Sequence, residues 1–116
     1  MRAVMALLIF LSTGLCAVRA QQASQADEVT QGHRLAVEIC SICHLAAPDQ
    51  THQPMLKPPG PPFTSIAQRP DISAQSLTKF ITTTHRGLDN PAGMPNPDLA
   101  DYQVKEVVAY ILSLRK

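Results

Sequence analysis

Apolar residues recur at the three- and four-residue spacing of an amphipathic helix in two long stretches of the chain. In the first stretch, about residues 27–43, the repeating positions are Val29, Gly32, Ala36, Ile39 and Cys43. In the last, about residues 101–115, they are Val104, Val107, Val108, Ile111 and Leu114. No stretch alternates cleanly between apolar and polar residues, as a half-buried strand does. The pattern therefore predicts an all-α fold.

Two shorter helices are expected between these stretches. Residues 63–68 have room for one helical turn, and Ser73 is a suitable N-cap for a second helix. That helix would carry Leu77, Phe80 and Ile81 on one face. The remaining segments favour loops. Residues 48–62 hold six prolines, and residues 86–98 are rich in Gly, Pro, Asn and Asp, so neither segment can form a regular element.

The N-terminal segment has the pattern of an export signal. Arg2 precedes an apolar run from Ala3 to Leu11, and small residues at Val18 and Ala20 fit a cleavage site. This predicts a signal peptide over 1–20, a flexible lead-in over 21–26, one domain over 27–116 and a periplasmic product. An uncleaved signal acting as a membrane anchor is less favoured, because a spanning helix needs about 20 apolar residues. After cleavage, no integral membrane span is expected.

The composition of the chain excludes some classes of function and indicates a bound group. The 116 residues carry a net charge of only +1 with 16% charged residues, which excludes a disordered acidic tail and a broad nucleic-acid surface. Aromatic residues make up 4% and Trp is absent, so a bound group is expected to complete the core. Residues 57–86 have a net charge of +3. This segment either steers an acidic redox partner or is simply solvated.

The residues that carry chemistry are Cys40, Cys43 and His44, in a C-x-x-C-H motif. On a helix these three positions share a face. Two thiols at this spacing can add to the two vinyl groups of one haem while the adjacent imidazole reaches the iron, so we expect one covalent haem c per chain. Zinc would want four ligands, a thioredoxin-like dithiol would want a βαβ setting, and a disulfide would leave His44 unexplained.

With this motif, the chain resembles the class I cytochromes c of the bacterial single-haem type over nearly all of residues 27–116. The supporting stretches are Gly32 before the motif, Gly60-Pro61-Pro62-Phe63 after it, Met94-Pro95, and the C-terminal helix. The resemblance implies the cytochrome c fold, in which three to four short helices and long loops wrap one covalent haem. It implies close crossing of the first and last helices at Gly32.

The resemblance also implies ligand roles. His44 is the proximal iron ligand, and its hydrogen bond goes to the carbonyl of Pro61, with Pro59 as the alternative. Met94 is the distal iron ligand, a role for which Met55 and His85 are weaker candidates. His33 and His52 are expected to face solvent. Ala100 stands where the family usually has a Ser or Thr helix cap, so Asp98 or Asp101 is expected to cap the last helix.

An iron with both axial positions filled leaves no place for a substrate, and no nucleophile–base pair is visible. The expected function is one-electron transfer between exported redox proteins, not enzymatic catalysis. Partners would be a periplasmic dehydrogenase, an oxidase or another cytochrome. One alternative is a dedicated haem c subunit of a periplasmic dehydrogenase, with Met55, Leu56 and Phe63 as its interface. Another is a gas sensor or peroxidase in which Met94 is displaced.

Overall fold

The computed structural model describes residues 22, 24–87, 89–90 and 93–116, and every regular element within these ranges is helical. A helix over residues 24–38 comes first. It is followed by the 3₁₀ turn η1 (Cys40–Ile42) and by α2 (Phe63–Ala67), α3 (Ala74–Ile81) and α4 (Asp101–Ser113). This confirms the predicted all-α fold. The predicted signal peptide at 1–20 lies outside the described residues.

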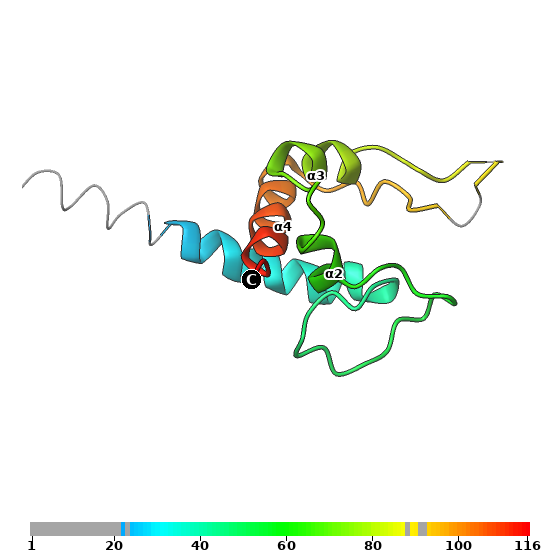
Figure 1. Ribbon diagram of the computed structural model, residues 1–116, viewed down its shortest axis with the longest axis horizontal. Helices are drawn as coiled ribbons and strands as arrows, with labels where there is room; N and C mark the ends of the chain where they lie inside the picture. The colour runs from blue at the N-terminus through cyan, green and yellow to red at the C-terminus, as the bar shows by residue number, and fades with distance from the viewer. Residues whose placement is uncertain (1–21, 23, 88, 91–92) are drawn as a thin grey trace, which may run out of the picture.

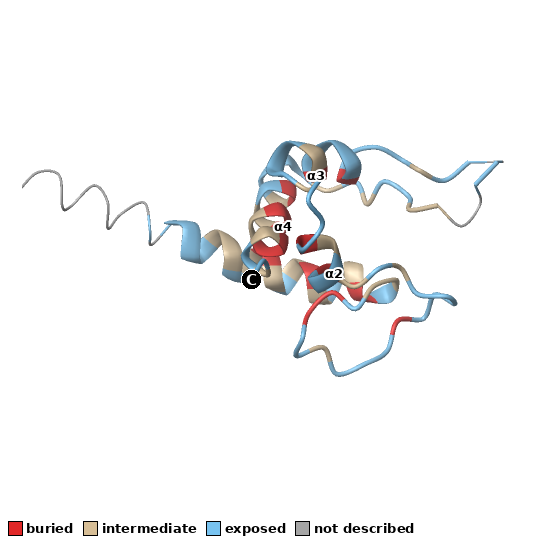
Figure 2. Ribbon diagram, viewed as in Figure 1, coloured by how far each residue is buried: buried red, intermediate tan, exposed pale blue. Residues whose placement is uncertain are grey.

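The core forms around α4, which crosses the N-terminal helix and packs against α2 and α3 (Figure 1). Its buried positions are Val104, Val107, Val108, Tyr110 and Ile111. Buried residues also face inward from α2 and α3 (Figure 2). Among the described residues, no helix has the length and apolar character needed to cross a membrane.

The crossing of the N-terminal helix and α4 depends on Gly32. A Cβ at this position would lie 1.9 Å from the carbonyl oxygen of Glu106 and 2.8 Å from the Cβ of Tyr110. The backbones are therefore in direct contact, and the close approach expected at Gly32 is confirmed. Ala36, one turn later, is fully buried. Small residues on this face allow the two helices to pack without a side chain between them.

The first helix differs from its prediction at both ends. It includes residues 24–26, which the sequence assigned to a flexible lead-in, and it ends at residue 38, not 43. Cys40–Ile42 forms a 3₁₀ turn instead. The reason is that the amides of Cys43 and His44 both donate to the carbonyl of Cys40, at 3.1 and 2.9 Å. Such tightening is common where a helix ends.

The cap of α3 is confirmed. The amide of Ser76 donates to Ser73 Oγ at 3.1 Å, and the amide of Ser73 donates to Ser76 Oγ at 2.8 Å. Leu77 and Ile81 are buried, while Phe80, on the same face of the helix, is 45% exposed. Its ring stacks on His85 at the edge of the apolar stripe, with ring centroids 3.8 Å apart.

Both ends of α4 also differ from the prediction. Neither Asp98 nor Asp101 provides the expected cap. Instead, the amide of Ala100 donates to Oε1 of Gln103 at 3.0 Å. The helix ends at Ser113, two residues earlier than predicted. Beyond it, the guanidinium of Arg115 donates to the carbonyls of Ala67 and Ile72, at 3.0 and 2.9 Å, and so ties the C-terminus to the end of α2.

Candidate functional site

The two cysteines of the motif lie on one tight turn as free, partly buried thiols. Burial, reinforced by the neighbouring Cys43, raises the pKa of the Cys40 thiol from 9.0 to about 11. A redox-active dithiol depends on a lowered thiol pKa, which makes the thiolate available. The environment of Cys40 has the opposite effect, so this turn lacks the electrostatics of a thioredoxin-like site.

His44 follows the turn, and its ring is held in one orientation. Its Nδ1 lies 2.8 Å from the carbonyl oxygen of Pro61. Because a carbonyl can only accept, Nδ1 carries the hydrogen, which leaves the lone pair of the neutral ring on Nε2. A Cβ at Gly60 would lie 2.5 Å from Cε1 of this ring, so only glycine lets the chain pass so close. The acceptor is Pro61, as the resemblance implied, and not Pro59.

The end of the proline-rich segment runs alongside the motif. The amide of Gly60 donates to the carbonyl of Cys43 at 2.7 Å, and the amide of Phe63 donates to that of Leu45 at 3.0 Å. His44 and Gly60 form an isolated parallel bridge. Further along, the amides of Met55 and Leu56 both donate to the carbonyl of Ile42, at 2.8 and 3.3 Å. A segment without regular structure is thus fixed to the motif at several points.

Gln50, which was not among the predicted site residues, holds the start of this segment together. Its Oε1 accepts from the amide of Ala46 at 2.9 Å. Its Nε2 donates to the carbonyls of His52 at 2.8 Å and His44 at 3.3 Å. One amide side chain thus forms hydrogen bonds with three backbone groups of a loop that has no regular secondary structure to pair them. No local pattern marks a glutamine for this role.

His33 and His52 contact this region from two sides. His52 is exposed, as expected, and its Nε2 lies 3.0 Å from the buried Ser41 Oγ, which donates to the carbonyl of Val37. His33 is half-buried, contrary to expectation. Its Nε2 is 2.8 Å from Asp49 Oδ1, and this hydrogen bond holds the pKa of Asp49 below its ordinary value. The two histidines therefore hold the loop in place.

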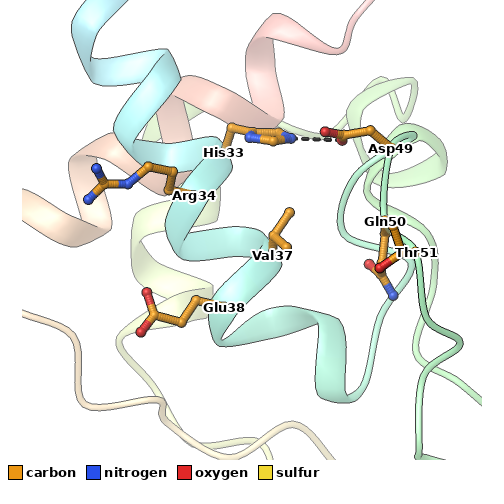
Figure 3. Close-up of a pocket in the computed structure, with 7 residues that line it drawn as sticks. All are labelled: His33, Arg34, Val37, Glu38, Asp49, Gln50 and Thr51. Atoms are coloured by element: carbon orange, nitrogen blue, oxygen red, sulfur yellow. Dashed lines mark hydrogen bonds and ion pairs between the residues drawn. The ribbon is translucent and has the colours of Figure 1, made fainter.

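A shallow hollow lies between the N-terminal helix and the loop at residues 49–51 (Figure 3). His33 and Asp49 meet across it, and the other lining residues are Arg34, Val37, Glu38, Gln50 and Thr51. It contains none of the predicted site residues. Nearby, the hydroxyl of Tyr110 donates to the carbonyl of Ala46 at 3.2 Å and so joins α4 to the backbone just after the motif.

Met94 is half-buried and lies on the second long loop. The described residues of that loop bond to the end of α3 and to the residues just beyond it, and not to the motif. The amide of His85, just beyond α3, donates to the carbonyl of Met94 at 2.8 Å. The two long loops extend from the helices toward the same end of the molecule (Figure 1). The structure thus brings Cys40, Cys43, His44 and Pro61 together. Met94 lies apart from them, on the second long loop.

These residues fit a covalently held haem. Two unpaired thiols share one turn with an imidazole whose Nε2 lone pair is available. Apolar side chains are exposed around them, namely Ile42, Leu45, Met55 and Leu56. A large apolar group at the motif would cover this surface.

Comparisons with known proteins agree with this geometry. The profile of the Cytochrome c family matches residues 29–115. Cytochrome c-552 of Bradyrhizobium diazoefficiens is 33% identical over 106 residues, which cover 88% of this chain and 93% of that protein. No solved structure matches the chain significantly. Since the family match extends from the N-terminal helix through the motif and both long loops to the end of α4, the chain belongs to the cytochrome c family.

Proposed function

We propose that this protein is an exported one-electron carrier that holds one haem c through Cys40 and Cys43, with His44 and Met94 as axial ligands. The family to which it belongs consists of haem c electron carriers. When bound, the haem iron supplies the exchange between Fe(II) and Fe(III). The observation that carries the proposal is the His44 ring, fixed by Pro61 beside two free thiols on the same turn.

The chain's own residues have distinct tasks in this function. Cys40 and Cys43 would hold the haem edge as thioethers. Pro61 keeps the hydrogen of His44 on Nδ1, which orients Nε2 toward the metal and increases its basicity as a ligand. Met94 would supply a neutral thioether, which favours the reduced iron and raises the potential. None of these residues acts as an acid, base or nucleophile, so we propose no enzymatic activity.

Export would place this carrier in the periplasm among dehydrogenases, oxidases and other cytochromes. The basis is the sequence of residues 1–20, with its positive start, apolar run and small residues before Gln21. Cleavage would leave no membrane-spanning segment. An uncleaved signal would instead anchor the same domain at the membrane surface.

A dedicated subunit of a periplasmic dehydrogenase is the second candidate function. One observation favours it: Met55 is 79% exposed at the motif side of the molecule, beside the exposed Leu56. The third residue of the interface expected from the sequence, Phe63, is only 5% exposed and belongs to the core, so that part of the prediction was wrong. Size-exclusion of the native protein separates a free carrier from a stable complex.

The main experiment examines holoprotein made from the full chain with haem-maturation machinery supplied. Mass spectrometry should show the polypeptide plus one haem. In the oxidised state, the weak far-red band of a sulfur–iron bond should be present in wild type and in Met55→Ala, and absent in Met94→Ala. A secreted polypeptide without the haem mass would refute the proposal. A wild type without the band would instead favour the sensor or peroxidase alternative.

A further inference from the structure

The loop that carries Met94 is attached to the end of α3 at two described points: through His85, and through Asn96, whose Nδ2 donates to the carbonyl of Thr82 at 3.2 Å. The amide of His85 donates to the carbonyl of Met94 at 2.8 Å, and its carbonyl accepts from Nδ2 of Asn90 at 3.1 Å. A Cβ at Gly93, the residue before Met94, would lie only 1.8 Å from the His85 carbonyl oxygen. The backbone at His85 is therefore in direct contact with the backbone that precedes and includes Met94.

The ring of His85 is fixed in turn by α3. It stacks on the ring of Phe80 with centroids 3.8 Å apart and an angle of 14° between the planes. Its Nε2 lies 3.2 Å from the carbonyl oxygen of Phe80, which can only accept, so Nε2 carries a hydrogen. This hydrogen bond occupies Nε2, so in this conformation only Nδ1 of His85 has a lone pair that could bind a metal.

We infer that His85 is a positioning residue for Met94, an inference that rests on the proposed ligand role of Met94. Contacts run from Phe80 on α3 to the His85 ring, and from the His85 backbone to Met94. Helix α3 is anchored in the core through Leu77 and Ile81. The stack thereby fixes His85, and with it the carbonyl of Met94, relative to a helix that is packed into the core.

The measurement that tests this inference is the binding of free imidazole to oxidised holoprotein. Imidazole can bind the iron only when Met94 has left, so its apparent affinity rises as the Met94-bound state is weakened. Loss of an aromatic stack corresponds to about a two- to tenfold change in an equilibrium constant. We expect His85→Ala to bind imidazole about two- to tenfold more tightly than wild type, with a weaker sulfur–iron band.

Two further variants make the test specific. His85→Phe keeps a flat ring on Phe80, so it should recover most of the wild-type affinity. If His85→Ala does not fold, Phe80→Leu removes the same stack from the exposed side of α3 and should shift the affinity in the same direction. The matched control is His33→Ala, since His33 also contacts an aromatic ring, that of Tyr110, but lies on the N-terminal helix, away from the Met94 loop. It should leave imidazole binding unchanged.

The outcomes distinguish this inference from the proposed function. If the sulfur–iron band persists in Met94→Ala, the ligand assignment fails, and the inference fails with it. If Met94→Ala loses the band while His85→Ala and Phe80→Leu bind imidazole as wild type does, only the positioning role is refuted. A wild type without the band whose spectrum changes in His85→Ala would make His85 itself a ligand, which overturns both.

Discussion

The two loops that carry the proposed axial ligands are built differently. The loop beyond His44 is joined to the motif by the Pro61 hydrogen bond and by backbone bonds at Met55, Leu56 and Gly60. The Met94 loop is joined to the end of α3 through His85 and through the bond from Nδ2 of Asn96 to the carbonyl of Thr82. Segments with few anchoring contacts open more readily than densely bonded ones. Of the two proposed axial ligands, we therefore expect Met94, and not His44, to be the one that leaves the iron.

The largest effect is expected from Gly60→Ala, which tests the densely bonded side. The added Cβ would lie 2.5 Å from a His44 ring that is fixed by Pro61, so ring and loop cannot both stay in place. Loss of such an orienting contact lowers metal affinity by at least about tenfold. We expect the haem content per polypeptide, measured by absorbance and mass spectrometry, to fall by about that factor.

Gly87→Ala is the matched control for this change. Among the residues that the structure describes, a Cβ at Gly87 would closely approach only the carboxylate oxygen of Asp89, at 2.9 Å, and that side chain can move aside. Its haem content should equal that of wild type. Equal haem content in Gly60→Ala would show that the close fit around His44 is not required.

A smaller effect, confined to the distal ligand, is expected from Gly93→Ala. Its Cβ would lie 1.8 Å from the backbone oxygen of His85, which cannot rotate away, so the loop must shift. Because the motif side is untouched, haem content should match wild type while the sulfur–iron band is lost. Spectra of the oxidised holoprotein check this, again against Gly87→Ala. An intact band would show that Met94 stays in place when its loop is shifted, and this would contradict the comparison of the two loops.

Tyr110→Phe tests the anchor between α4 and the motif side. Removing the buried hydrogen bond to Ala46 should lower the free energy of unfolding by about 1 kcal/mol. Burial, and then the charge of Asp49, raises the pKa of Tyr110 above 10.0. Because the folded state holds this proton more tightly, wild type should lose stability as the pH rises past that value. Urea unfolding at neutral and alkaline pH should show that loss in wild type but not in Tyr110→Phe.

The smallest effect is expected from Asp49→Asn, which removes a charge at the start of the proline-rich loop. The hydrogen bond with His33 lowers the pKa of Asp49 below 3.8, so its contribution to stability is present above that value and is lost as the pH falls through the folded-state pKa. The urea midpoints of variant and wild type should differ slightly at neutral pH and coincide in strong acid. A difference that persists in acid would assign it to something other than this carboxylate.

Local patterns predicted the parts of the fold that depend on neighbouring residues. Ser73 marked a helix start, the prolines marked a loop, and the apolar spacing after residue 100 marked α4. Gly32 and Pro61 were also located correctly, through a motif resemblance that fixes their place relative to Cys40. In each case the determining residues lie close together in the sequence or in a fixed register.

The missed features depend on contacts that form only after folding. The 3₁₀ turn at Cys40 arises from two amides sharing one carbonyl. Gln50 and Gln103 were overlooked because an amide side chain in the sequence carries no signal of the backbone groups that it will satisfy. Spacing placed Phe80 on the apolar face of its helix, but the ring that it stacks on, that of His85, lies beyond the helix end. Periodicity alone cannot reveal such a stack.

The bond from Tyr110 to Ala46 spans 64 residues. A polypeptide is synthesised from its N-terminus, so the thiols of the motif leave the ribosome well before the tyrosine that anchors the backbone behind them. During that interval, the segment after His44 lacks its connection to the last helix. Docking of α4 therefore fixes the backbone behind the motif only after both cysteines have been synthesised.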